Sequence, residues 1–340
     1  MKYLSLFSGI EAATVAWKPI GWEAVAFSEV AKFPSSVLSY HYPDVPNLGD
    51  ISLVTEEQIK ALGEIDVVVG GSPCQDLSTF GGREGLSGSK SSLFFEQIRV
   101  FKLAQKHCGA RWMIWENVVG AFSSNKGRDF ASVVEQMVGE SVSVPDKGWC
   151  KEGVAIGGNG LLEWSVLDAQ WWGLAQRRKR IFAVLDTGDW CDRPPILLES
   201  ESSKGDVETL QQERSQKMPS GDFFLGECGR TRVDILPTVS STLLATGGRR
   251  DLATEDFIPV QRVYSSLDNE FKPDSLRALT TIECERLQGF PDNYTKVPYI
   301  HYSINDCPKG SRRKSIGNSM PVNVMRWIGK NIEKACSHEG

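Results

Sequence analysis

Two side chains that can take part in chemistry follow apolar runs in this sequence. The first is Cys74, which comes after the run 65–69 and the short turn 70–73. Four β-branched residues bounded by glycines predict a buried strand, and ligands of open α/β sheets bind just past such strand ends. We interpret the Cys74 thiol as a candidate nucleophile. The alternative is a small buried apolar side chain, which is what most free cysteines are.

The second is Glu116, which follows the apolar run 111–115 and begins the tripeptide Glu116-Asn117-Val118. Burying a carboxylate is costly unless it is paired or used. Glu116 is therefore a second catalytic candidate, and a structural carboxylate that caps the following turn is the alternative.

Cations alternate a little further along the chain. Arg178 and Arg180 belong to the run Gln176-Arg177-Arg178-Lys179-Arg180. In an extended segment alternate side chains point the same way, so Arg178 and Arg180 are expected to face one site together. A solvated basic patch is the alternative.

A strand, a glycine turn and a helix open the chain, with the strand at residues 3–7, the turn at Ser8-Gly9 and the helix ending near Pro19. This layout places backbone N–H groups against a ligand. Glu29 stands 20 residues after Gly9, at the end of the next predicted strand, where an acid accepts hydrogen bonds from ribose hydroxyls. A surface carboxylate is the alternative. Asp50 offers a second acid, suited to an adenine amino group.

A nicotinamide enzyme uses the same geometry, but its fingerprint needs glycines where this chain has Glu11 and Ala12. A nucleoside cofactor without phosphates fits better.

Composition narrows the class of protein. The 340 residues are 41% apolar and 24% charged, with a formal net charge of −5, which excludes a globally basic nucleic-acid binder but not a locally basic face. The eight cysteines are scattered without a CxxC pair, which predicts a reducing compartment and no metal site. No run approaches ~18 apolar residues, so we expect a cytoplasmic protein without a membrane span.

The remaining segments are expected as follows. Residues 78–92, rich in glycine and serine, are either a lid or an ordinary surface loop. Residues 199–216 are expected to be a charged linker or an exposed insertion, and residues 223–265 an irregular β region with arginines at loop tips. Other expected elements are helices at 31–41, 93–106 and 127–139, a loop at 141–160, strands at 161–168 and 180–186, and a Gly317-Asn318-Ser319 turn that opens the last helix.

Six motifs stand in the order found in one enzyme family. They are Phe7-Ser8-Gly9, Pro73-Cys74-Gln75, Glu116-Asn117-Val118, the run 176–180, the block Arg277 to Tyr294, and Gly317-Asn318-Ser319. Over nearly its whole length the sequence resembles the cytosine-C5 DNA methyltransferase family. One departure is Glu11-Ala12, where the family usually has more glycine.

The resemblance implies S-adenosylmethionine as cofactor and double-stranded DNA as partner, with catalysis by Cys74, Glu116, Arg178 and Arg180. The expected cofactor residues are Phe7, Ser8, Gly9, Ile10, Glu29, Val30, Asp50, Ile51, Gly71, Pro73, Leu93, Asn318 and Ser319. The expected DNA contacts are Gln75, Ser78, Arg83, Arg230, Arg249 and Arg250, since an arginine in a loop binds either a phosphate or a guanine edge.

The chemistry of that family calls for these residue types. Cytosine C5 is a weak nucleophile, so a thiolate, here Cys74, first adds to C6 of a base rotated out of the duplex. Charge builds up on the ring, and Glu116 at N3 and Arg180 at O2 are suited to offset it.

The expected fold is α/β, with a Rossmann-like S-adenosylmethionine-dependent methyltransferase domain at 1–190. A smaller, irregular β-rich target-recognition domain follows at 191–305, and residues 306–340 return to the first domain. We expect a monomer. The alternatives are a cytosine methyltransferase of transfer RNA and a catalytically idle DNA-binding protein of the same fold.

Overall fold

A mixed seven-stranded sheet forms the centre of the protein. The computed structural model describes residues 1–73, 93–198, 257–259 and 276–338. The strand order is β2-β1-β3-β4-β7-β6-β5, in which β1 to β4 are parallel and β7, β6 and β5 run antiparallel to their neighbours. The strands are β1 (Lys2–Leu6), β2 (Glu23–Ser28), β3 (Val67–Gly70), β4 (Trp112–Val118), β5 (Glu152–Gly157), β6 (Gly160–Asp168) and β7 (Lys179–Asp186).

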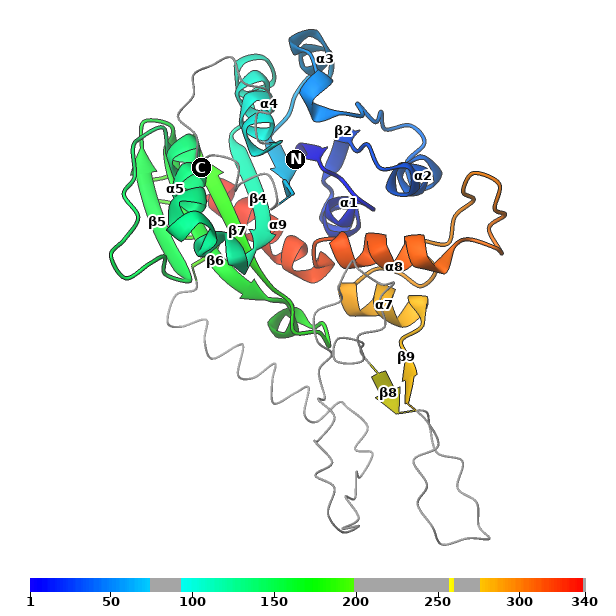
Figure 1. Cartoon of the computed structure of the whole chain (residues 1–340). Helices are drawn as coiled ribbons and strands as arrows, with labels where there is room; N and C mark the ends of the chain where they lie inside the picture. The colour runs from blue at the N-terminus through cyan, green and yellow to red at the C-terminus, as the bar shows by residue number, and fades with distance from the viewer. Residues whose placement is uncertain (74–92, 199–256, 260–275, 339–340) are drawn as a thin grey trace, which may run out of the picture.

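Helices cover both faces of the sheet (Figure 1), which confirms the α/β class. One hydrophobic cluster receives α1 (Ala12–Trp17), α2 (Lys32–His41), α7 (Thr281–Gln288), α8 (Lys309–Asn318) and α9 (Val322–Ser337). The other receives α3 (Glu56–Ala61), α4 (Leu93–Cys108) and α5 (Arg128–Val138). Short 3-10 helices are η1 (Lys18–Ile20), η2 (Ile51–Leu53), η4 (Val119–Phe122), η5 (Ser124–Gly127) and η6 (Ala169–Trp172).

The apolar run of β3 is explained by burial on both faces. Val67 and Val69 belong to the cluster with α1 and α9, and Val68 belongs to the cluster with α4 and α5. A strand covered on both sides needs apolar residues at every position, which is why this one is continuous rather than alternating.

The last helix packs against the first. Trp17 Nε1 donates to the carbonyl of Met325 at 2.7 Å, and a Cβ added at Gly329 would lie 2.6 Å from the same nitrogen, so the helices meet where a glycine allows it. Leu279, Cys284 and Phe290 enter the same cluster.

The expected division of the chain into domains at 1–190, 191–305 and 306–340 stays a prediction.

Two stretches differ from the sequence expectations. The expected loop at 141–160 contains strand β5, which pairs with β6 at the sheet edge. Gly317 and Asn318 do not form a turn that opens the last helix; they are the final residues of α8. Side chains of Gln288 and Arg178 bond to the carbonyls of Ile316 and Gly317, which satisfies the last turn of that helix.

Only part of the expected β region lies within the described residues. There β8 (Phe257–Pro259) and β9 (Leu276–Ala278) form an antiparallel pair. The expected linker 199–216 and the loop 78–92 lie outside the described residues.

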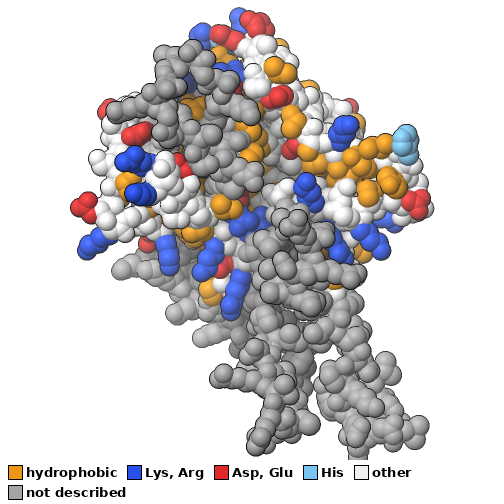
Figure 2. Space-filling model, viewed as in Figure 1, with side chains coloured by type: hydrophobic (Ala, Val, Ile, Leu, Met, Phe, Trp, Pro, Cys, Tyr) orange, Lys and Arg blue, Asp and Glu red, His pale blue; other side chains and the backbone are white. Residues whose placement is uncertain are grey.

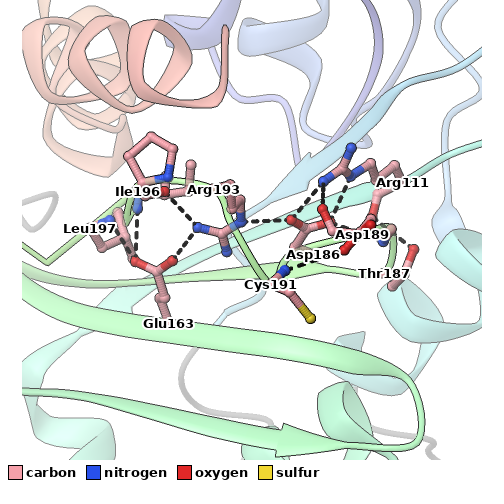
Figure 3. Close-up of polar contacts among 11 residues, drawn as sticks. Arg111, Glu163, Asp186, Thr187, Asp189, Cys191, Arg193, Ile196 and Leu197 are labelled. Carbon is pink, nitrogen blue, oxygen red and sulfur yellow. Dashed lines mark hydrogen bonds and ion pairs between the residues drawn. The ribbon is translucent and has the colours of Figure 1, made fainter. Parts of the chain in front are cut away.

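A buried ion-pair network ties the sheet to the segment after β7 (Figure 3). Arg193 donates to Glu163 Oε1 at 2.6 Å and to Asp186 Oδ2 at 2.7 Å, and its side chain is 1% exposed. Arg111 donates to Asp186 Oδ1 at 2.7 Å. Backbone N–H groups of Ile196 and Leu197 bond to the other Glu163 oxygen, so this network holds residues 193–197 against the sheet.

Removing one member of this network is expected to leave buried charge without its partner. Arg193→Ala should lower the free energy of unfolding by about 3 kcal/mol, measured by urea denaturation. The matched control is Arg286→Ala, which breaks an exposed ion pair with Asp292 and should cost far less stability. Equal losses in the two variants would contradict a structural role for the network.

Candidate active site

The candidate site lies at the carboxyl ends of β1, β3 and β4. Strands β2 and β3 lie on opposite sides of β1, so the chain leaves the ends of β1 and β3 in different directions. Open α/β sheets bind ligands at such a switch point. Residues 7–11 and 71–73 emerge here, and both segments contain residues predicted for the cofactor.

Glu116 lies beside the turn that leads to Cys74. The strand continues three residues beyond the predicted end, so Glu116 lies within β4 rather than after it. Gly70 pairs with Trp115, and a Cβ added at Gly71 would lie 3.0 Å from Glu116 Oε2. Glycine at position 71 therefore lets the carboxyl group approach the backbone three residues before Cys74.

Arg180 forms an ion pair with the Glu116 carboxylate. Arg180 Nε lies 3.2 Å from Glu116 Oε1, and both side chains are largely buried. Burial raises the pKa of Glu116 above its ordinary value, while the charges of Arg180 and Arg178 act in the opposite direction. Both arginines therefore lie close enough to Glu116 for their charges to act on it, and Arg180 forms the ion pair.

Arg178 joins this site to the end of α8. Its Nη2 donates to the carbonyls of Gly317 at 2.9 Å and Ser319 at 2.8 Å. The side chain is buried, and burial, with the nearby charge of Arg180, lowers its pKa to about 9. Arg178 therefore brings its charge close to Glu116 while it bonds to Gly317 and Ser319, which lie 139 and 141 positions after it in the chain.

The turn before Cys74 is fixed by residues to which the sequence analysis assigned no role. Trp115 Nε1 donates to Ser72 Oγ at 3.1 Å, and Asn117 Nδ2 donates to the Ser72 carbonyl at 3.1 Å. Alternation along β4 was the available signal, because it places Trp115 and Asn117 on the face opposite Glu116. Cys74 itself lies outside the described residues.

The loop after β1 has an unusual backbone. Phe7, Gly9 and Glu11 have φ angles of 52°, 55° and 66°, in the left-handed region that L side chains rarely adopt. Gly9 N–H donates to Glu29 Oε2 at 2.8 Å, and the hydroxyl of Tyr294 donates to the Ile10 carbonyl at 2.8 Å. Glu29 and Tyr294 therefore hold this loop from two other parts of the chain.

Four other residues predicted to bind the cofactor differ in how far they are exposed to solvent. Val30, next to Glu29, is 67% exposed, whereas Ile51 is buried. Asp50 is exposed, and its Oδ1 caps η2 by accepting from the Ser52 N–H. Leu93 begins α4 and is half-buried.

The remaining predicted residues are two cofactor residues at the end of α8 and the DNA contacts. Asn318 is exposed at the end of α8, and Ser319 is buried after it. The predicted DNA contacts Gln75, Ser78, Arg83, Arg230, Arg249 and Arg250 lie outside the described residues.

Glu11 occupies the position where the resemblance calls for glycine. The residue is 1% exposed, and its carboxyl group accepts hydrogen bonds from Ser5 Oγ, Thr14 N and Thr14 Oγ1 at 2.8 to 3.1 Å. The side chain caps α1, which stabilises a backbone conformation that glycine would adopt without strain. Burial raises the pKa of Glu11 from 4.5 to about 7, although the Ser5 and Thr14 hydrogen bonds lower it.

This pKa makes stability depend on pH. The folded protein keeps a proton on Glu11 that the unfolded chain has lost, so stability is expected to fall as pH rises from about 4.5 to about 7. The loss amounts to about 3 kcal/mol. Glu11→Gln should remove it, which urea unfolding at pH 5 and pH 8 will measure against the exposed control Glu64→Gln. Parallel pH profiles of wild type and Glu11→Gln would contradict this.

The described residues were also compared with the requirements of a metal site and of a membrane-spanning helix. In the part of the chain that the structure describes, no group of three or more His, Cys, Asp or Glu side chains is arranged to hold a metal ion. No helix among these residues is long and apolar enough to cross a membrane.

Comparison with solved structures supports the fold. The Dnmt2 methyltransferase of S. pombe superposes with a TM-score of 0.61 at 15% identity, covering 98% of both chains. The Entamoeba histolytica methyltransferase EhMeth gives a TM-score of 0.57 at 12% identity, covering 98% of this chain and 97% of that one. At such identities the similarity concerns the fold alone.

Comparison of sequences identifies the family. The chain is 24% identical over 360 residues to the type II methyltransferase M.NgoPII of Neisseria gonorrhoeae, covering 98% of this chain and 96% of that protein. It is 27% identical over 463 residues to the DNA N-6-adenine-methyltransferase of Escherichia phage P1, covering 98% of this chain but only 61% of that relative's length. The profile of the C-5 cytosine-specific DNA methylase family matches residues 1–219 and 196–334. The chain therefore belongs to the C-5 cytosine-specific DNA methylase family and is a DNA cytosine-5 methyltransferase.

Proposed function

We propose that Cys74 is the nucleophile of this methyltransferase and that Glu116 is its acid partner. The observation that carries this proposal is the position of the Glu116 carboxyl group against Gly71, three residues before Cys74, with Arg180 Nε at 3.2 Å from its Oε1. A buried carboxyl group whose pKa is raised keeps a proton more readily than an exposed one, which suits a donor to the cytosine ring.

The residues have complementary roles at the target base. The Cys74 thiolate adds to C6 while Glu116 donates to N3, so that the negative charge that develops on the ring is offset. The electron pair then makes C5 nucleophilic. Once C5 carries the methyl group, loss of the C5 proton releases the thiolate. Arg180 holds Glu116 in place and adds positive charge near O2.

S-adenosylmethionine, when bound, supplies a methyl group on a positively charged sulfur. The described residues fit its nucleoside part: Glu29 is held by the N–H groups of Gly9 and Ala31 at the end of β2, which directs its carboxylate toward the switch point. The exposed apolar side chain of Val30 stands next to it, suited to an adenine ring.

The loop 7–11 fits the remaining part of the cofactor. Its left-handed residues turn the backbone sharply after β1, and Glu11 points away into the protein rather than into the loop. Glu11 in place of glycine is therefore compatible with a ligand at Phe7, Ser8 and Gly9. Gly71, Leu93 and Ser319 complete the proposed cofactor residues at this edge of the sheet.

The substrate of this reaction is proposed to be cytosine in double-stranded DNA, acted on by a monomer. One relative is an adenine N6 methyltransferase by name. Transfer to an exocyclic amine needs no addition to a ring carbon, so a thiol three positions after Gly71, which lies against Glu116, favours C5 of cytosine over that reaction.

A single labelling experiment tests the proposal. The purified chain is incubated with tritiated S-adenosylmethionine and either unmethylated bacterial genomic DNA or transfer RNA, and the nucleosides are separated. We expect label in 5-methyl-deoxycytidine. Label in N6-methyl-deoxyadenosine or in transfer RNA, or no label in either nucleic acid, would overturn the substrate or the activity.

A further inference from the structure

Exposed cations occur in two segments near the carboxyl end of β4, outside the residues assigned above. Arg180 in β7 pairs with Val118, the last residue of β4. The turn η4 follows Val118 directly and packs against β7. Lys179 begins β7, and Lys126 lies in η5, which packs against η4. Both lysines therefore belong to segments near the end of the sheet that contains Glu116.

In the segment that leads into β7, buried and exposed side chains alternate. Leu174, Gln176 and Arg178 are buried, whereas Arg177 and Lys179 are exposed. Arg178 therefore supports the catalytic site from inside. Lys179 extends into solvent one residue away from Arg180, which contacts Glu116.

The turn that carries Lys126 has a fixed and strained shape. Asn125, Lys126 and Gly127 have φ angles of 48°, 57° and 83°, which is costly for the first two. Trp149 Nε1 donates to the Gly127 carbonyl at 2.8 Å, and Ser124 Oγ donates to the buried Asp129. These bonds hold the turn so that Lys126 is exposed.

These cations are available to an external anion. Within residues 1–73, 93–198 and 278–338, neither Lys126, Arg128 nor Lys179 forms an ion pair, and all three are exposed. Asp129 is the neighbouring acid, and it is buried. Figure 2 shows Lys and Arg side chains along the lower side of the molecule, where the lower end of β7 lies in Figure 1.

We propose that Lys126 and Lys179 bind phosphate groups of the DNA backbone next to the target cytosine. The proposal rests on the proposed function, because it takes duplex DNA as the partner. A chain with a net charge of −5 repels DNA as a whole, so its affinity must come from local cations. Lysines on a rigid turn and at a strand end lose little freedom when they contact phosphate.

Salt dependence distinguishes a phosphate contact from a structural role. The probe is a fluorescein-labelled mixed-sequence duplex of about 30 base pairs, whose binding is followed by fluorescence anisotropy between about 50 and 200 mM KCl without a methyl donor. Wild type is compared with Lys126→Gln, Lys179→Gln and the double variant. Lys126→Gln keeps a side chain of similar shape in the left-handed position. The control is Lys60→Gln, in α3 near the opposite end of the sheet, where the side chain is also exposed.

We expect each substitution to weaken binding several-fold and to reduce the slope of log affinity against log salt by roughly one, and the double variant to lose roughly two. Lys60→Gln should keep the wild-type slope, and all variants should keep the wild-type thermal midpoint. Unchanged slopes in the double variant, or losses with transfer RNA but not with the duplex, would overturn the inference. Because the binding assay needs no methyl transfer, an inactive wild type would count against the proposed function alone.

Discussion

Cys74→Ser is expected to lower the rate of methyl transfer to DNA below about one-thousandth of the wild-type rate, because a serine hydroxyl is hardly ionised near neutral pH and adds poorly to C6. Cofactor and DNA affinity should stay close to wild type, since the substitution exchanges one atom. The rate is measured by tritium transfer, and the two affinities by equilibrium binding.

The control for this substitution is Cys150→Ser, at an exposed cysteine between α5 and β5. A second measurement uses duplex DNA that contains 5-fluorocytosine, in which fluorine replaces the C5 hydrogen, so the adduct is not released by loss of a proton. Wild type and Cys150→Ser should be trapped through residue 74 in the presence of the methyl donor, and Cys74→Ser should not. Near-normal turnover of Cys74→Ser, or an adduct at another cysteine, would remove Cys74 from the mechanism.

Glu116→Gln is expected to lower the rate constant at saturating DNA by about a hundredfold or more while the duplex still binds. Glutamine keeps the size of the side chain but has no acidic proton to give to N3. In the wild type, burial keeps the proton on Glu116 to higher pH than on an exposed glutamate, although Arg180 and Arg178 oppose this. The rate should therefore fall as pH rises through the pKa of Glu116, and the variant should lack this step.

The matched control is Glu64→Gln, an exposed acid that is paired with Lys2 before β3. Single-turnover rates across pH separate chemistry from binding. A Glu116→Gln enzyme with the wild-type rate constant, or with the wild-type pH profile, would show that the carboxyl group plays no part in the chemical step.

The sequence predicted the edge of the sheet that contains Glu116 because the relevant signals are local. Apolar runs before Gly70 and Glu116 identify two strands, and parallel neighbours place their carboxyl ends together. The alternation of Arg178 and Arg180 likewise predicted that both face one site, and in the structure both charges affect the Glu116 pKa.

The parts that sequence reasoning missed depend on contacts between distant segments. The end of α8 is stabilised by Arg178 and Gln288, which no local pattern around Gly317 reveals. In the sequence, Glu11 is only a departure from a pattern of glycines. The structure shows that Ser5 and Thr14 are arranged to bind its carboxyl group. Strand β5 was missed since its glycines at 153 and 157 resemble a loop, although Gly153 makes room for the Trp164 ring of β6.

The packing of α9 on α1 has a consequence for biosynthesis. Trp17 bonds to Met325 across 308 positions, so the face of α1 that packs on α9 stays uncovered until the ribosome has made residues 322–337. Contacts of such long separation form late in folding. The loop 7–11, which leads into α1, therefore gains its full support late, and we expect the enzyme to acquire activity only after α9 has been made, with chains truncated before α9 being retained by chaperones or degraded.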